Sequence, residues 1–266
     1  MSKKKRDIPV FNHPIIETHC HLDYLEGEDL ADVLARATAH GVERVVTIGV
    51  SPGNLAKVRE LTQNPLVWGT LGVHPHDAKE FTDETAAEIL AHGNDDKIVA
   101  VGEIGLDYYY DHSDRAVQRK VFEQQLDLAI QLNQPIVVHT READDDMQAI
   151  LKNFSAQLPK KGVIHSFTSG LPLAEYCLSE GFMLGFNGIV TFNAADNVRE
   201  VLAATPLEQV VVETDAPYLT PAPYRGRSNE PQYLPFIIEK IAEVKGITNE
   251  QVLASTYANA NRLFSF

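Results

Sequence analysis

The sequence predicts an α/β fold, a closed (β/α)8 barrel of the TIM type, from three observations. Short apolar runs rich in β-branched residues occur eight times, amphipathic segments separate them, and the 266 residues suit one such barrel. This alternation favours a parallel sheet with right-handed crossovers. The eight predicted strands are Ile15–His19, Arg44–Gly49, Val67–Val73, Ile98–Glu103, Pro135–His139, Gly162–His165, Phe182–Phe186 and Gln209–Glu213.

The segments between the predicted strands have the apolar spacing of amphipathic helices. The clearest is Asp114–Asn133, in which apolar side chains recur every three or four residues and the first residue can cap the helix. Thr82–His92 and Gly170–Glu180 are shorter helices of the same kind, and Pro231–Phe266 is predicted to form two more. Three glycines follow predicted helix ends, where a left-handed backbone is expected: Gly41, Gly93 and Gly181.

An open, doubly wound sheet is the alternative to a closed barrel. No G-x-G-x-x-G follows the first predicted strand, so the dinucleotide-binding form of that fold has no support. No linker or low-complexity tract interrupts the pattern, and residues 1–266 are expected to form a single domain. Residues 1–13 are expected to be a flexible tail, whose basic run Lys3–Arg6 is either solvated or a nucleic-acid arm.

Composition and charge restrict the location and the partners. The sequence has no apolar run near the roughly 18 residues of a membrane span, no signal-peptide pattern, and only two cysteines, Cys20 and Cys177. The cytoplasm is therefore expected, with no membrane association and no obligate protein partner. The net charge of −14 disfavours non-specific attraction to nucleic acid, so a polyanionic substrate would need bound metal and local arginines.

Six potential metal ligands fall at or near the ends of predicted strands, where barrels carry their chemistry. Two of them, His19 and His21, share a strand face because the side chains of a strand alternate between its two faces. Cys20, which lies between them, would then face the helices as a small buried residue. One H-x-H motif is a modest signal, but two more histidines and two carboxylates make it strong. The predicted ligands are His19, His21, Glu103, His139, His165 and Asp215.

Six ligands exceed what one cation needs, which suggests two divalent cations with Glu103 as a bridge between them. Mixed imidazole and carboxylate ligands suit Zn²⁺, Mn²⁺, Fe²⁺ or Ni²⁺, whereas carboxylate- and water-rich coordination suits Mg²⁺. Asp215 could bind metal and also accept the proton of an attacking water, so Asp215 and Glu103 are the candidate catalytic residues. Glu213, on the same strand face as Asp215, could orient a metal-binding histidine or be an ordinary buried carboxylate.

Three further residues are candidates for contact with substrate. Arg141 follows His139 by two residues, and Arg225 lies in the loop after the eighth predicted strand. Guanidinium groups suit phosphate oxygens, although a surface ion pair is the alternative for each arginine. His74 ends the third predicted strand and could bind a phosphate or a nucleobase, or make a structural hydrogen bond.

Eight motifs lie in order along nearly the whole chain: Glu17–Asp23, Gly72–His76, Val101–Tyr109, Pro135–Arg141, His165–Phe167, Glu213–Leu219, Arg225–Pro231 and Asn259–Phe264. Together they resemble the motifs of one family, the TatD deoxyribonucleases, and those around the fourth and eighth predicted strands are the most specific. Glu17 and Ser166 depart from the family pattern, in which aspartate and cysteine or another small residue are common, but neither is an expected ligand.

The resemblance implies a barrel of the metal-dependent hydrolase (amidohydrolase) superfamily with the same six ligands, usually associated with Mg²⁺. It implies a deoxyribonuclease of the 3′–5′ exonuclease type, whose partner is DNA as a single strand or a 3′ end. An esterase or amidase, such as a D-aminoacyl-tRNA deacylase, remains the alternative because the same barrel and metals serve it. A non-enzymatic metal-binding protein is less well supported, since structural metal sites are usually closed by four ligands.

Overall fold

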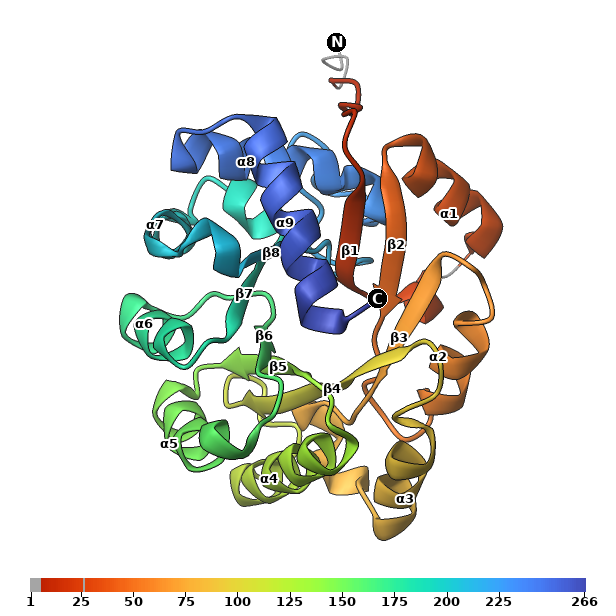
Figure 1. Cartoon of the computed structure of the whole chain (residues 1–266), viewed down its shortest axis with the longest axis vertical. Coiled ribbons are helices and arrows are strands. Elements are labelled where there is room, and N and C mark those ends of the chain that lie inside the picture. Colours follow the sequence, from red (N-terminus) through yellow and green to blue (C-terminus); the bar gives the residue numbers. More distant parts are fainter. Residues whose placement is uncertain (1–5, 26) are drawn as a thin grey trace.

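The computed structural model describes residues 6–25 and 27–266 and confirms the predicted barrel (Figure 1). Eight strands form one sheet in chain order, and each strand is parallel to its neighbours. Backbone bonds from Asp215 N to His19 O (2.9 Å) and from His21 N to Ala216 O (2.8 Å) join the segment after the last strand to the first strand. The strands are β1 Ile15–Cys20, β2 Val42–Thr47, β3 Val67–Leu71, β4 Ile98–Asp107, β5 Ile136–Arg141, β6 Gly162–Ile164, β7 Met183–Phe186 and β8 Val210–Val212.

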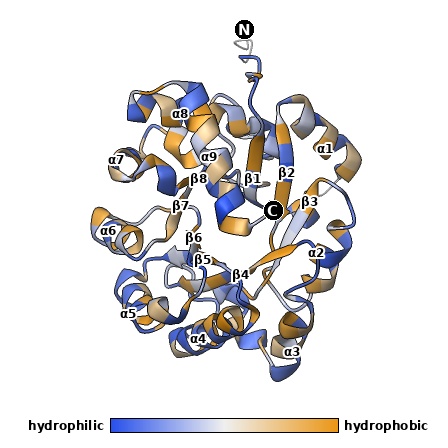
Figure 2. Cartoon of the chain, in the orientation of Figure 1, coloured by the Kyte–Doolittle hydropathy of each residue, from blue (hydrophilic) through white to orange (hydrophobic). Residues whose placement is uncertain are grey.

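The helices surround the strands, and Figure 2 shows mixed polar and apolar colouring along them, as helices with one face on a sheet require. Asp114 caps the longest helix as predicted, because its Oδ1 accepts a hydrogen bond from Ala116 N at 2.8 Å. The region Pro231–Phe266 holds two α-helices, also as predicted. The α-helices are α1 Leu30–Ala39, α2 Leu55–Leu61, α3 Asp83–His92, α4 Arg115–Leu132, α5 Asp144–Phe154, α6 Leu171–Ser179, α7 Asp196–Ala204, α8 Leu234–Lys245 and α9 Asn249–Phe264.

Besides shifts of one or two residues at strand ends, two details of the prediction are wrong. Gly41 and Gly181 have the expected positive φ of 87° and 89°, but Gly93 has a φ of −64°. A Cβ at Gly93 would lie 2.4 Å from Leu132 Cδ1, so glycine is needed there for space and not for a left-handed backbone. The second error concerns β4, which was expected to end at Glu103.

Strand β4 continues four residues beyond Glu103 because Ile104–Asp107 pair with β5. The register shifts between Gly102 and Ile104, so Glu103 is the extra residue of a β-bulge. Bulges re-aim a side chain relative to the regular pleat. Gly105, with a φ of +142°, permits the continuation, since a Cβ there would lie 2.0 Å from His139 O.

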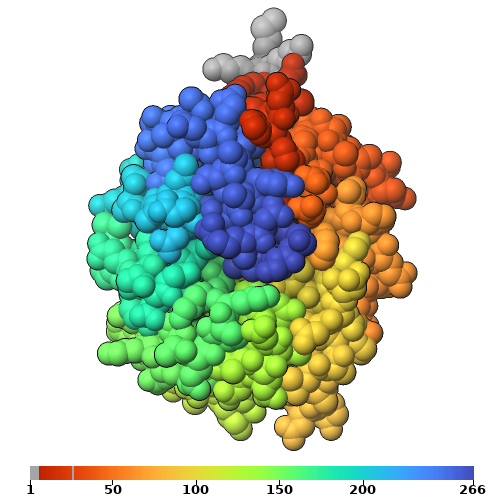
Figure 3. All heavy atoms as spheres, viewed as in Figure 1, coloured from red at the N-terminus to blue at the C-terminus, as the bar shows by residue number. Residues whose placement is uncertain are grey.

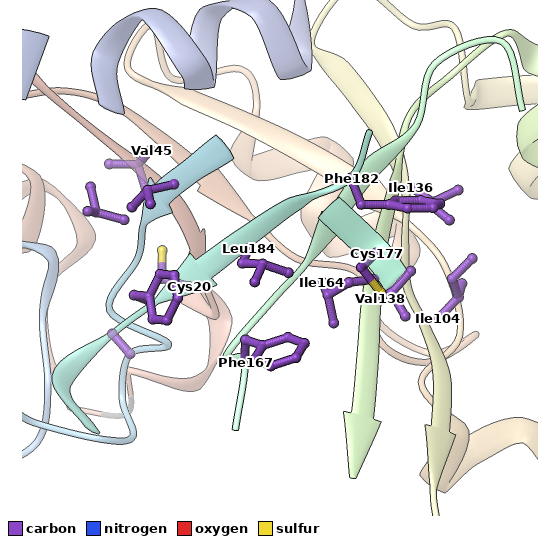
Figure 4. Close-up of a cluster of buried hydrophobic side chains, with 14 of the residues drawn as sticks. Cys20, Val45, Ile104, Ile136, Val138, Ile164, Phe167, Cys177, Phe182 and Leu184 are labelled. Carbon is purple, nitrogen blue, oxygen red and sulfur yellow. The ribbon is translucent and has the colours of Figure 1, made fainter. Parts of the chain in front are cut away.

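Apolar side chains form two buried clusters, one between the strands and the helices and one inside the barrel. Figure 4 shows part of the first cluster, which includes Cys20 as a small buried residue, as expected. The second cluster joins inward valines to Leu263 and Phe264 of α9. Figure 1 shows this C-terminal helix, in dark blue, lying across one opening of the barrel, and Figure 3 shows its atoms near the centre of that face. Its Asn259 bonds Val210 O at the start of β8, so the covered opening is the N-terminal end of the strands.

The expected flexible tail lies partly outside the described residues, which exclude Lys3–Lys5. Within them, the Arg6 guanidinium donates to Glu239 Oε1 of α8 at 2.5 Å, and Arg6 O accepts a bond from the Tyr224 hydroxyl at 3.0 Å. Across residues 6–25 and 27–266, no helix has both the length and the apolar character that crossing a membrane requires.

Candidate metal centre

The six predicted ligands come together at the C-terminal end of the barrel, opposite the end that α9 covers. Two positions follow from the strands themselves: His19 and His21 stand two apart at the end of β1, on one face. The other four arrive from separate elements, namely Glu103 from the bulge of β4, His139 from β5, His165 from the residue after β6, and Asp215 from the loop after β8.

Glu103 is the centre of this arrangement, and its two oxygens face different histidines. Oε2 lies 3.3 Å from His19 Nε2. Oε1 lies 2.8 Å from His165 Nε2, 3.0 Å from His139 Nδ1 and 3.4 Å from His74 Nε2. The side chain is buried, so these imidazoles replace the water that would otherwise solvate a carboxylate.

Asp215 stands on the β1 side of Glu103. Its Oδ1 lies 3.4 Å from His21 Nε2 and 3.6 Å from His19 Nε2. The Asp215 backbone is left-handed, with a φ of 59°, and its N–H donates to His19 O. This backbone bond fixes the carboxylate beside β1, which explains why a residue three positions beyond β8 reaches the histidines. Strain of this kind is common where a side chain must be held for function.

Several buried ring nitrogens make no well-aligned hydrogen bond with the described residues, namely both of His19, both of His165, and Nδ1 of His21, although two of these nitrogens lie near Glu103 oxygens. Each unpartnered buried polar atom costs about 1–3 kcal/mol unless a ligand satisfies it. Three sets of ligand atoms, each within 4.8 Å of one another, could hold an ion: His19, His165 and Asp215; His19, His21 and Glu103; His74, Glu103 and His139. The donor set therefore fits one or more divalent cations.

The carboxylates and His74 have the charge states that suit cation binding. Burial opposes ionisation of Glu103, but the imidazoles of His165, His74 and His19 hold its pKa well below the usual range. Burial likewise opposes ionisation of Asp215, but the hydrogen bond with His21 and the charges of the neighbouring histidines together outweigh it and lower the pKa. Burial and the neighbouring His139 lower the pKa of His74 to about 4, so that ring is neutral at pH 7. Burial opposes protonation of His165, His139 and His21, but neighbouring carboxylates outweigh it and raise the pKa of each ring. Because ionised carboxylates and neutral imidazoles are the forms that bind metal, a cation would displace protons from these rings.

His74 and Asp107 belong to this cluster more closely than the sequence indicated. His74 was expected to contact substrate, and the structure also places it in a possible ion-binding set with Glu103 and His139. Asp107, which was missed, lies with Oδ2 at 2.9 Å from His139 Nε2 and 3.0 Å from His76 Nε2. Asp107 lies four residues after Glu103, and residues an even number apart on a strand share a face. This spacing would have identified Asp107 as a candidate if β4 had been predicted to continue beyond Glu103.

Glu213 lies beside His165 and outside the cluster of six predicted ligands. Its Oε1 accepts a hydrogen bond from Ser166 N at 2.6 Å and lies 3.4 Å from His165 Nδ1. Glu17 is buried nearby and accepts bonds from the backbone of His19 (3.1 Å) and Thr214 (2.9 Å). These two carboxylates thus contact the segments that carry the histidines.

The two candidate arginines lie outside the ligand cluster. The Arg141 guanidinium lies 4.0 Å from the centre of the Tyr109 ring, and that of Arg225 lies 3.6 Å from the centre of the Phe192 ring. Neither side chain makes a hydrogen bond or ion pair with any part of the chain that the structure describes. Each lines a cleft, of about 660 Å³ and 590 Å³ respectively, and Thr168 lines both clefts.

Comparison with known proteins places this barrel in a family. Residues 16–265 match the family model described as "TatD related DNase". The metal-dependent hydrolase YabD of Bacillus subtilis is 38% identical over 252 residues, which are 94% of this chain and 98% of that protein. The "3'-5' ssDNA/RNA exonuclease TatD" of Citrobacter rodentium is 37% identical over 243 residues, 89% of this chain and 92% of its own.

A solved structure agrees with the sequence matches. The crystal structure of YJJV, a TatD homologue from Escherichia coli K12, superposes with a TM-score of 0.89 at 30% identity. The match covers 95% of this chain and 98% of that one. The chain therefore belongs to the TatD family of metal-dependent hydrolases.

Proposed function

We propose that this protein is a divalent-metal-dependent deoxyribonuclease that hydrolyses phosphodiester bonds from the 3′ end of single-stranded DNA. The observation that carries the proposal is Glu103, whose Oε2 faces His19 while its Oε1 faces His139 and His165. A carboxylate in this position can bridge two cations, an arrangement that suits in-line displacement at phosphorus. His19, His21 and Asp215 would hold one cation with Glu103, and His139 and His165 would hold the other.

Bound divalent cations would supply Lewis-acid activation of water and neutralise charge on the phosphate. The Asp215 carboxylate, kept ionised by its neighbours, would accept the proton of the attacking water. Glu213, at 3.4 Å from His165 Nδ1, and Asp107, at 2.9 Å from His139 Nε2, would orient the two imidazoles. Zn²⁺, Mn²⁺, Ni²⁺ and Mg²⁺ are all compatible with this donor set.

Arg141, Arg225 and His74 would contact the substrate. In a chain with a net charge of −14, an arginine without a carboxylate partner is available to an anion. Planar guanidinium groups bind phosphate oxygens in pairs. The single-stranded substrate is supported by the similarity to the Citrobacter rodentium protein, which is named a 3′–5′ exonuclease for single-stranded DNA and RNA.

The test is cleavage of an oligonucleotide by the purified protein after the removal and return of metal. A 5′-labelled single strand should shorten stepwise from its 3′ end with added Mg²⁺, Mn²⁺, Ni²⁺ or Zn²⁺, and should stay intact with EDTA. A 3′-labelled strand should release its label at once. D-aminoacyl-tRNA is the comparison substrate, because the same barrel could cleave its ester.

Two results would contradict the proposal. Deacylation of D-aminoacyl-tRNA without any oligonucleotide shortening would assign the site to ester hydrolysis instead. Internal cuts without stepwise shortening would retain the nuclease but refute the exonuclease type.

A further inference from the structure

Exposed aromatic side chains gather around the candidate metal centre. Tyr24, Tyr109, Tyr110 and Tyr218 are four of the six exposed large hydrophobic residues that the described residues contain. Each of the four follows the C-terminal end of a strand: one follows β1, two follow β4 and one follows β8. An exposed tyrosine is ordinary by itself, but this concentration on one rim marks a binding surface.

One pair lies on the β1–β8 side of the centre. The Tyr24 ring stacks on His21, with centroids 5.3 Å apart and an interplanar angle of 19°. The Tyr218 ring meets His21 edge-on at 6.3 Å, and Tyr218 N donates to Asp215 O at 2.9 Å. Tyr218 is 53% exposed, so it is fixed at its backbone while its ring is open to solvent.

The other pair lies on the β4–β5 side. The backbone N–H groups of Tyr109 and Tyr110 both donate to Asp107 Oδ1, at 3.0 and 2.9 Å. The second oxygen of Asp107 contacts His139, so one carboxylate positions both the tyrosines and a candidate ligand. Tyr109 is 52% exposed, and the guanidinium of Arg141 lies over its ring.

The strand order places these two pairs across the centre from each other. In a closed ring of eight strands, β4 and β5 lie opposite β8 and β1. Glu103 lies between them, with its Oε2 toward His19 of β1 and its Oε1 toward His139 of β5. A chain that crosses the mouth above Glu103 would therefore pass one tyrosine pair on each side.

We propose that Tyr218 and Tyr109 each stack on one base of a single-stranded nucleic acid, on opposite sides of the phosphodiester that is cleaved. This inference rests on the proposed nuclease function and deepens it. Stacking on a tyrosine requires an unpaired base with a free face, which excludes a continuous duplex at the centre. Because every base has a flat face, such a site tolerates any sequence. Arg141, held over Tyr109, binds the phosphate next to the base on that side.

The test compares four variants: Tyr218→Ala, Tyr218→Phe, Tyr109→Ala and Tyr109→Phe. Each alanine variant should raise KM for a single-stranded oligonucleotide roughly 5- to 100-fold, with little change in kcat, since base–aromatic stacking has that strength. Each phenylalanine variant should remain near wild type because it keeps the ring. Tyr257→Ala, in α9 at the other end of the barrel, is the matched control.

Abasic substrates distinguish the proposed stacking site at Tyr218 from the one at Tyr109. An abasic site in the terminal nucleotide should cancel the effect of one alanine variant, and an abasic site in its neighbour should cancel the effect of the other. Methyl p-nitrophenyl phosphate, a small diester without bases, should be hydrolysed equally by all variants that retain the metal centre.

The outcomes distinguish this inference from the proposed function. A wild-type enzyme that cleaves oligonucleotides while both alanine variants keep their KM would overturn the stacking sites alone. The stacking sites would also be overturned if each phenylalanine variant raised KM as much as the matching alanine variant. They would likewise be overturned if abasic sites left the KM effects of both alanine variants unchanged. A wild-type enzyme that cleaves no oligonucleotide with any of the metals would remove both proposals.

Discussion

The two ends of the barrel are built from the same strands but differ in what fills them. At the N-terminal end, inward valines pack with Leu263 and Phe264 of α9 into a dry cluster. At the C-terminal end, the interior is polar, and ring nitrogens of His19, His21 and His165 lack well-aligned hydrogen bonds in the described part of the chain. The interior of the barrel is therefore apolar at one end and polar at the other.

Individual β-strands pass from the apolar part of the barrel interior to its polar part within two residues. Val137 belongs to the apolar cluster inside the barrel, and His139, two residues later on the same strand, contacts Glu103. The pair Val163 and His165 repeats the pattern at β6. Two residues advance the chain by about 7 Å, which is enough to leave the packed layer for the polar mouth. Mutations at the two ends should accordingly separate into losses of activity and losses of stability.

The largest effect is expected at the polar end, from Asp215→Asn. Loss of the carboxylate charge should lower kcat roughly 100- to 10,000-fold, because the variant can neither accept a proton nor hold a cation as well. The free energy of unfolding should change little by comparison. Asp127→Asn, on the exposed face of α4, should behave as wild type in both measurements. Unimpaired turnover in Asp215→Asn would refute its role.

The next effect is expected at the apolar end, from Phe264→Ala. Phe264 is 2% exposed, and its removal should lower the free energy of unfolding by about 3–5 kcal/mol in a urea titration. The kcat of the folded fraction should be retained, since this residue lies at the opposite end from the proposed metals. Leu90→Ala, an exposed control in α3, should change stability by less than about 0.5 kcal/mol. A fall in kcat without a loss of stability would contradict the division between the ends.

The smallest effect is expected just behind the polar end, from Glu213→Gln. The amide keeps an oxygen for Ser166 N but loses the charge beside His165. The apparent affinity for Mn²⁺, measured from the rise in Tm as metal is added, should weaken roughly 10- to 100-fold. Glu175→Gln on the surface of α6 should leave the metal response intact. An unchanged response in Glu213→Gln would make this residue an ordinary buried carboxylate.

The sequence by itself determined the eight strands, the cap at Asp114 and the histidine pair of β1. These follow from local patterns, because strand alternation, helical spacing and capping depend on residues close together in the chain. The positions of His19 and His21 on one face required only the two-residue period of a strand. Even the apolar role of Cys20 followed from that period.

Only the tertiary structure decided the rest of the candidate site. The bulge at Glu103 and the continuation of β4 to Asp107 depend on pairing with β5, which no local pattern specifies. The closeness of His74 to Glu103 depends on the packing of β3 against β4. That Arg141 has no carboxylate partner among residues 6–25 and 27–266 depends on which acidic residues the folded chain brings near it. Register and ring closure are properties of the whole sheet, so they place side chains in ways that sequence spacing cannot express.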